Sequence, residues 1–267
     1  METDKNYSEF YFKKRINQKE KLQHPPIAIN ITNTNYEFTP FVTYGNFSAI
    51  KGKGKSMKSF FKSALEACYI GGNAQNYFLN INGVGSKGKM VLSFDTEQGN
   101  FHVQKSEKRV LSMVGVETYP GLITYPLREY EPAERVEIIE GILKLKFLKD
   151  TVGLVTIDGV ADLVSNVNDL KECNALITKL MQWTTNFNVA IIVVIHENHE
   201  GGKPTGHLGS SIIKKCETTV SVTKYNEFVT VEPFATRNMP FENFTFTINE
   251  NGLPYECEEN SGATGLR

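Results

Sequence analysis

The sequence predicts an α/β protein with a mostly parallel central sheet, flanking helices and a C-terminal antiparallel extension. Three observations predict this fold class. Short apolar segments alternate with amphipathic helical segments between residues 46 and 195, which is typical of parallel β-α-β units. The segment 189–195 is apolar throughout, as expected for a strand buried on both faces. Strand-like segments joined by short turns then follow residue 217.

Each expected element depends on its own pattern. Strands are short apolar or alternating segments bounded by turn residues, and we expect them at residues 46–51, 89–94, 121–127, 152–157, 189–195, 218–223, 227–234 and 243–248. Helices carry apolar side chains on one face, and we expect them at residues 58–70, 101–114, 132–148 and 170–187. Pro132 suits the first turn of the third helix, where a backbone N–H is not needed.

Length and composition indicate a globular protein without a strong charge bias. A chain of 267 residues is long enough for one large α/β domain whose core needs no disulfides. The apolar share of 40% and the charged share of 22% argue against a disordered chain. The formal net charge of −1 gives no independent support for a nucleic-acid partner, although basic side chains can still gather on one face.

Cysteine spacing and hydropathy predict a cytoplasmic protein with no membrane segment. The four cysteines are Cys68, Cys173, Cys216 and Cys257, and no two of them form a C-x-x-C pair. This spacing argues against a structural zinc site or a disulfide framework and fits a reducing compartment. The N-terminus is polar, unlike a signal peptide, and the longest apolar run, at 189–195, is too short to span a bilayer.

The chain divides into an arm, a body and a tail. We expect residues 1–26 to form an N-terminal arm with one helix that ends at Pro25 and Pro26. Its aromatic residues either dock on the body or on a neighbouring subunit, or the arm is a solvated terminus. The body spans residues 27–252, and residues 253–267 are expected to be a disordered tail.

A candidate phosphate loop lies between the first strand and the first helix of the body. The P-loop pattern is G-x-x-x-x-G-K-[ST], and the segment matches it at every fixed position except the second glycine. Its residues are Gly52, Lys53, Gly54, Lys55, Ser56, Met57, Lys58 and Ser59. Backbone N–H groups at the helix start would face an anion, and Lys58 would reach the β- and γ-phosphates of ATP.

The last three residues of this loop differ in how well they fit the pattern. Met57 stands where glycine is usual, and we expect it to restrict the backbone and to alter the loop or weaken binding. Lys58 is expected in an exposed loop with little packing, and the hydroxyl of Ser59 would bind Mg²⁺. The alternative interpretation is a basic, glycine-rich surface loop, and the strand–loop–helix context favours the phosphate loop.

Carboxylates follow two other expected strands. Asp158 ends the apolar strand at 152–157, and burial there would favour a nearby magnesium ion, although an Asp before a glycine can also cap a turn. Glu97 follows the strand at 89–94 and is the candidate general base that polarises water, while Asp95 is the better candidate for a turn cap. The alternative for this segment is a polar turn after a buried strand. Because ligands bind at the carboxyl ends of strands in open α/β sheets, we expect Lys58, Glu97 and Asp158 to meet.

The strand at 189–195 is followed by two histidines. His196 is a candidate sensor of the γ-phosphate at the end of this strand. His196 and His199 have the spacing of a metal pair, but helical geometry is not expected there, so zinc is disfavoured.

Several segments together resemble the RecA/KaiC-like ATPases, and most of all the RepA- and DnaB-type helicase-related proteins of mobile elements in Bacteroidetes-like bacteria. The segments are GNFSAIKGKGKSMKS, VLSFDTEQG, LVTIDGVADLV, VVIHENH followed by GHLGSS, and ATRNMPFENFTF. The resemblance covers about residues 27–252. It implies a RecA-like core with ATP at the interfaces of a ring, commonly of six subunits.

The resemblance also implies roles for two late segments. Arg237 resembles the arginine finger that a neighbouring subunit contributes, although by residue type alone it would be a surface arginine. The loop at 197–211 lies where RecA-like proteins contact DNA, and basic residues in and just after it could meet phosphates. A mobile surface loop is the alternative.

These expectations favour a DNA-acting ATPase. The leading interpretation is a homo-oligomeric ring that hydrolyses ATP with Mg²⁺ and acts on DNA, single-stranded DNA above all, in replication, mobilisation or transposition of a mobile element. The alternative is a slow or inactive ATPase that serves as a nucleotide-dependent assembly or regulatory protein. A metabolic kinase is disfavoured, because no arginine-rich lid segment is found.

Overall fold

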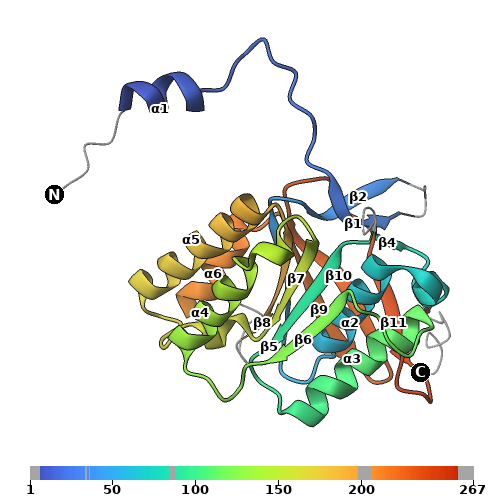
Figure 1. The fold of residues 1–267 in the computed structure, drawn as a ribbon. Helices are drawn as coiled ribbons and strands as arrows, with labels where there is room; N and C mark the ends of the chain where they lie inside the picture. The colour runs from blue at the N-terminus through green and yellow to red at the C-terminus, as the bar shows by residue number, and fades with distance from the viewer. Residues whose placement is uncertain (1–6, 34, 36, 84–87, 198–205, 258–267) are drawn as a thin grey trace, which may run out of the picture.

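The computed structural model describes residues 7–33, 35, 37–83, 88–197 and 206–257. Within these residues a nine-stranded sheet forms the centre of the molecule (Figure 1). Its strands are β3 (Phe47–Gly52), β5 (Met90–Asp95), β6 (Leu122–Pro126), β7 (Val152–Asp158), β8 (Ala190–His196), β9 (Thr218–Tyr225), β10 (Phe228–Thr236), β11 (Phe244–Ile248) and β12 (Pro254–Cys257). Their order across the sheet is β12-β11-β10-β9-β3-β8-β7-β5-β6.

The sheet is mostly parallel, as the sequence predicts. The strands from β9 through β3, β8, β7 and β5 to β6 are parallel neighbours, and β9 to β12 form an antiparallel extension. Strand β8 lies between β3 and β7 and is hydrogen-bonded to both. The predicted α/β fold class and the antiparallel extension are therefore confirmed for the described residues.

Helices cover both faces of this sheet (Figure 1). One face carries α2 (Lys58–Ile70), α3 (Asn100–Val114) and the short 3-10 helix η1 (Gly72–Asn76). The other face carries α4 (Pro132–Leu143), α5 (Leu170–Phe187), α6 (Gly206–Lys215) and the short 3-10 helices η2 (Lys146–Leu148) and η3 (Val160–Leu163). The parallel strands alternate between the two resulting cores. In β3, for example, Ile50 packs on the α2 side and Ala49 on the α5 side.

A second, three-stranded sheet packs beside α2. It consists of β1 (Ile27–Thr32), β2 (Phe38–Thr43) and β4 (Ile81–Gly83), in the antiparallel order β2-β1-β4. Its buried side chains Ile29, Phe41 and Ile81 join the same core as Phe61 and Leu65 of α2. This sheet was not predicted from the sequence, because β4 has only three residues and Asn30 interrupts the apolar pattern of β1.

Three boundaries also differ from the sequence prediction. The helix expected at 132–148 ends at Leu143, because Lys144 caps it and a separate 3-10 turn follows. Residues 206–211, expected in a loop, begin α6. Residues 254–257, expected in the disordered tail, form β12 instead, because all four of them pair with residues of β11. The rest of the predicted tail from residue 258 lies outside the described residues.

The N-terminal arm projects from the body (Figure 1). It contains the helix α1 (Tyr7–Lys14), which ends well before the two prolines that were expected to stop it. From residue 10 to residue 26 every side chain is exposed, including Phe10, Tyr11 and Phe12. The arm's aromatic residues therefore do not dock on their own body.

Two expectations from composition can be compared with the described residues. No helix among them is long and apolar enough to cross a membrane. All four cysteines are free thiols, and Cys257 is the only one of the four that is not buried.

Candidate phosphate-binding site

The predicted site residues converge at one edge of the large sheet. The carboxyl ends of β3, β8, β7 and β5 meet there, with Gly52 level with His196 and Asp158 level with Asp95. A pocket of about 330 Å³ lies at this edge, within the size range of small-molecule sites. It is lined by Lys55, Ser56, Met57, Lys58, Ser59, Phe60, Glu97, Gln98, Ser106, Arg109, Asp158 and His196.

The loop before α2 adopts a strained backbone that fits its sequence poorly. Lys55 and Met57 have positive φ angles of 63° and 71°, in the left-handed region that glycine adopts most readily. This conformation costs about 1–2 kcal/mol for a residue with a side chain. Met57 thus adopts a left-handed backbone conformation that glycine would adopt without strain, and its side chain packs against the core. Strain of this kind is typical of functional loops.

Gly52 is needed at the start of the loop for a steric reason. A Cβ atom there would lie 2.4 Å from the backbone oxygen of Val222 and 2.6 Å from Oγ of Ser56. The loop therefore passes close against β9. No larger residue fits at position 52 unless the backbone moves.

Lys58 is buried, which corrects the expectation that it lies in an exposed loop. Its Nζ donates hydrogen bonds to the backbone oxygens of Gly52 (3.0 Å) and Lys53 (2.7 Å), and lies 3.3 Å from Nδ1 of His196. Burial lowers the pKa of Lys58, and the nearby carboxylates, led by Asp158, oppose this shift. The ammonium group is thus held inside the curve of the loop.

Asp158 ends β7, and one oxygen of its buried carboxylate has no hydrogen-bond partner among the described residues. Its hydrogen-bonded neighbour is the hydroxyl of Ser59, while Oδ2 is buried without a hydrogen-bond partner among the described residues. The Nζ atom of Lys62 lies 4.0 Å from this oxygen. Burial raises the pKa of Asp158. A cation at this point would offset the cost of the buried charge.

A buried ionic network lies next to Asp158 on the side of α2. Lys62 on α2 is fully buried, donates a hydrogen bond to Oγ of Ser93 (3.0 Å) and lies 3.4 Å from the carboxylate of Glu66. Thr156 donates a hydrogen bond to the same carboxylate. Burial alone would lower the pKa of Lys62, but the carboxylates of Glu66, Asp158 and others raise it overall.

This network has no recognisable signal in the sequence. Lys62 and Glu66 are four residues apart on a helix, the spacing of an ordinary solvated ion pair. Only the tertiary structure shows that α2 is buried on this face as well.

Glu97 and His196 both line the pocket and contact each other directly. Nε2 of His196 lies 2.7 Å from Oε1 of Glu97, and both side chains are partly exposed. The hydrogen bond from His196 lowers the pKa of Glu97, against a smaller raising effect of burial. Asp95 instead accepts hydrogen bonds from the backbone N–H groups of Glu97 and Gln98, which confirms the prediction that it caps the turn.

Besides Lys55 and Lys58, the pocket is lined by a cation that sequence reasoning missed, Arg109. It comes from α3, and its guanidinium lies 3.7 Å from the ring centroid of Phe60. Nη1 donates hydrogen bonds to the hydroxyls of Ser63 (3.1 Å) and Ser106 (3.2 Å). Burial lowers the pKa of Arg109, and the carboxylates of α2 and β7 oppose the shift. An arginine on a largely polar helix carries no recognisable motif.

Arg237 lies away from this pocket. Its N–H donates to the oxygen of Glu217 (2.9 Å), whose own N–H donates to the oxygen of Phe47 (2.7 Å). Arg237 is therefore at the amino end of β3, opposite the edge that carries the pocket. Its guanidinium donates to the backbone oxygen of Lys215.

The other predicted segments are only partly described. Most of the predicted DNA-contacting loop, including Lys203, lies outside the described residues, as does His199. Lys214 and Lys215 are exposed in the last turn of α6. No group of three or more His, Cys, Asp or Glu residues in the described part of the chain could hold a metal by itself.

Comparison with known proteins assigns no family to this chain, so the class of protein is defined by its fold and its pocket. No protein-family model matches the chain, and no curated protein matches its sequence. The protein is thus defined as an α/β protein with a large, mostly parallel sheet. A polar pocket with a strained glycine-rich loop lies at the carboxyl edge of that sheet.

Proposed function

We propose that this chain is a magnesium-dependent ATPase with a RecA-like core. The observation that carries the proposal is the meeting of Lys58, Glu97 and Asp158 from three strand ends in one pocket. One oxygen of Asp158 is buried there without a hydrogen-bond partner in the described chain. A cation held beside bound phosphates would satisfy that oxygen.

The residues present fit ATP and Mg²⁺. The first N–H groups of α2 point out of the helix start, which has no side-chain cap and no acidic residue in its first turn. Ser59 and Asp158 would hold Mg²⁺, which usually takes one or two protein ligands together with substrate phosphates. A site of that kind needs no preformed cluster of three acidic or histidine ligands. Bound Mg²⁺ supplies charge neutralisation on the phosphates.

Each side chain has a separate role in this proposal. Lys58 exchanges its backbone oxygen partners for the β- and γ-phosphates. Glu97 orients the attacking water and accepts its proton. His196 contacts both Lys58 and Glu97, so it is placed to respond when the terminal phosphate is lost.

The proposal extends to a ring that acts on DNA. Strand β3 has six residues, about 20 Å at 3.3 Å per residue, and Arg237 lies at its far end. Arg237 is therefore out of reach of its own pocket, so a role as an arginine finger would have to be played at the pocket of a neighbouring subunit, for which its exposure on the surface is suited. DNA as the substrate depends on the resemblance to helicase-related proteins and on the exposed basic end of α6.

Two observations favour the alternative, a slow ATPase that regulates assembly. The carboxylate of Glu97 is already engaged by His196, so water would have to compete for it. The strained backbone at Lys55 and Met57 also adds a cost to holding the loop in this form.

One pair of measurements tests the function. Nucleotide binding is measured with a fluorescent ATP analogue, and turnover is measured with and without single-stranded DNA. We expect ATP binding that needs Mg²⁺ and turnover that DNA stimulates. Slow turnover that ignores DNA would support the regulatory alternative, and absence of ATP binding would refute the nucleotide assignment.

Two variants connect that result to the site. Lys58→Ala should lose tight binding, whereas Lys105→Ala, which removes an exposed lysine on α3, should not. Glu97→Gln should bind ATP normally and lose about 10²–10⁴-fold in turnover, the usual contribution of a general base. Equal losses of binding and turnover in Glu97→Gln would assign it a structural role.

A further inference from the structure

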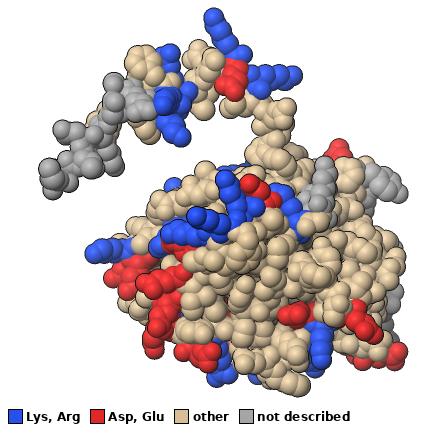
Figure 2. Space-filling view, viewed as in Figure 1, with Lys and Arg blue, Asp and Glu red and all other residues tan. Residues whose placement is uncertain are grey.

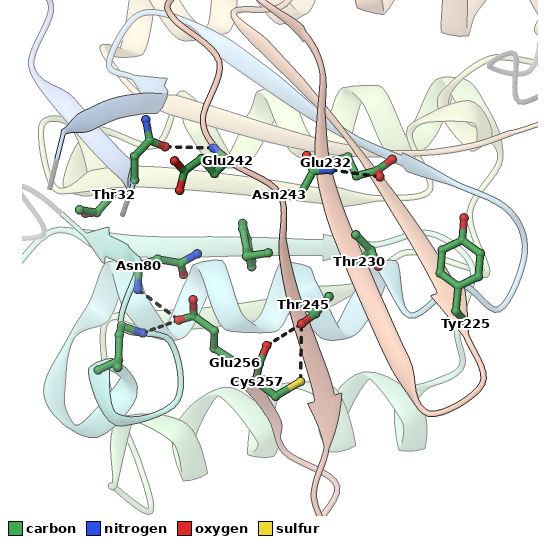
Figure 3. Close-up of a pocket in the computed structure, with 13 residues that line it drawn as sticks. Thr32, Asn80, Tyr225, Thr230, Glu232, Glu242, Asn243, Thr245, Glu256 and Cys257 are labelled. Atoms are coloured by element: carbon green, nitrogen blue, oxygen red, sulfur yellow. Dashed lines mark hydrogen bonds between the residues drawn. The ribbon is translucent and has the colours of Figure 1, made fainter. Parts of the chain in front are cut away.

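A second, larger cavity shares no lining residue with the phosphate-loop pocket. It is a groove of about 910 Å³ between the small sheet and the antiparallel strands β10, β11 and β12 (Figure 3). At one side Asn33 accepts a hydrogen bond from the N–H of Glu242 (3.0 Å). At the other, Glu256 accepts hydrogen bonds from the N–H groups of Leu79 (2.8 Å) and Asn80 (3.2 Å). These contacts hold the two walls of the groove together.

The groove is acidic and has an apolar rim. Glu232, Glu242 and Glu256 line it, and none of its described lining residues is Lys, Arg or His. Leu79 is 78% exposed and Tyr225 is 62% exposed at its margins. Such a surface fits a partner that is both basic and aromatic.

The N-terminal arm of this chain has that chemistry. Residues 7–26 contain five Lys or Arg residues and two Glu residues, and Figure 2 shows basic side chains gathered on the projecting arm. Phe10, Tyr11 and Phe12 are more than 60% exposed on α1. Arg15 lies over the rings of Tyr11 and Phe12, so charge and aromatic surface form one unit.

We propose that the acidic groove receives the N-terminal arm of a second copy of this chain. The aromatic side chains of α1 cover the exposed apolar rim, and Lys14 and Arg15 face Glu232 and Glu242. Each aromatic side chain can bury about 150–250 Å² in such a contact. The contact does not depend on nucleotide binding.

The arm is not packed against the body of its own chain. It projects from the body, and every side chain from residue 10 to residue 26 is exposed (Figure 1). The stretch from Arg15 to Pro26 spans about 35–40 Å when extended, enough to bridge to an adjacent molecule. Docking in trans would turn an exposed apolar helix into an interface.

Photo-crosslinking with isotope labelling tests the occupant. A photoreactive phenylalanine analogue replaces Phe12, and this chain is mixed with an ¹⁵N-labelled wild-type chain before irradiation. Crosslinks between unlabelled arm and labelled peptides of the groove, such as those containing Leu79 or Tyr225, are the expected result. Crosslinks only within one chain, or only to other surfaces, would overturn the proposal.

Charge reversal supplies an independent measurement. The paired changes Lys14→Glu and Arg15→Glu, or Glu232→Lys and Glu242→Lys, should weaken self-association at least about tenfold in analytical ultracentrifugation. Combining all four changes should restore it. Glu250→Lys, which reverses an exposed charge outside the groove, is the matched control and should leave association unchanged.

The outcomes separate this proposal from the ATPase. If arm variants associate like wild type, or if the combined variant does not recover, the arm–groove contact is wrong. A wild-type chain that remains monomeric at all concentrations would overturn the contact as well. Binding of the ATP analogue by the arm variants should stay normal in every case, because the arm does not line the phosphate-loop pocket.

Discussion

His196 and Glu97 are 99 residues apart in the sequence, yet Nε2 of one lies 2.7 Å from Oε1 of the other. The same imidazole approaches Nζ of Lys58 with its other nitrogen. His196 therefore joins the candidate phosphate-binding cation to the candidate general base. A change at either partner can alter the other through a single side chain.

The first prediction concerns the pH dependence of turnover. The hydrogen bond from His196 lowers the pKa of Glu97, and a base is active only when deprotonated. His196→Ala should raise that pKa, so activity should be lost at a higher pH as the solution is acidified. The measurement is a pH profile of turnover for wild type, His196→Ala and the control His102→Ala. An acid limb that stays in place in His196→Ala would show that Glu97 does not set it.

The second prediction compares two ion pairs of the same type. Lys62→Met leaves Glu66 and Asp158 buried without their cation, and breaking a buried pair in this way costs about 3–5 kcal/mol of stability. Lys144→Met breaks an exposed pair with Glu140 at the same helical spacing and should cost at most about 1 kcal/mol. Urea unfolding followed by circular dichroism gives both values. Similar costs for the two variants would mean that water reaches the Lys62 network.

The third prediction concerns the cation that the sequence did not reveal. If the guanidinium of Arg109 contacts bound phosphate, Arg109→Ala should weaken ATP binding about 10–100-fold, the worth of a charged hydrogen bond. Lys108→Ala, the exposed neighbour on the same helix, should bind like wild type. Titration with the fluorescent ATP analogue measures both. Unchanged affinity for ATP in a folded Arg109→Ala variant would show that Arg109 does not contact the phosphates and only packs on Phe60.

The fourth prediction concerns a shared site. Arg237→Ala should bind ATP nearly normally yet hydrolyse it poorly, with losses that reach about 10³–10⁵-fold for such fingers. Mixing it with Lys58→Ala creates interfaces that pair an intact loop with an intact arginine, and activity should partly return. Mixtures that assemble together and stay inactive would argue against a contribution from Arg237 in trans.

The parts of the fold that have clear local patterns were predicted from the sequence. The helix at 58–70 and the helix at 170–187 have the predicted bounds, because each has a regular apolar face and a defined start. The strands that carry Asp158 and His196 were predicted because they are apolar throughout. The convergence of Lys58, Glu97 and Asp158 followed from the rule that parallel strands share one carboxyl edge.

The missed features depend on tertiary contacts. Strand β4 has three residues and exists only because β1 is beside it. Strand β12 pairs with β11 although its four residues, PYEC, carry no clear strand pattern. Lys62 and Arg109 have the spacing of solvated charges, and only the packing of α2 against α3 places them beside the pocket. Charged residues on a helix cannot be assigned to a buried face from periodicity alone.

Strand β8 lies between β3 and β7, and this central position restrains the edge of the pocket that β8 carries. Because β8 is paired along both edges, it cannot slide without breaking two ladders at once, so it stays fixed while its surroundings change. The residue that follows β8 is held as well, because the N–H of Glu197 donates to the oxygen of Gly52 (3.0 Å) and its carboxylate pairs with Lys51. The end of β8 is thus tied directly to the start of the loop that holds Lys58.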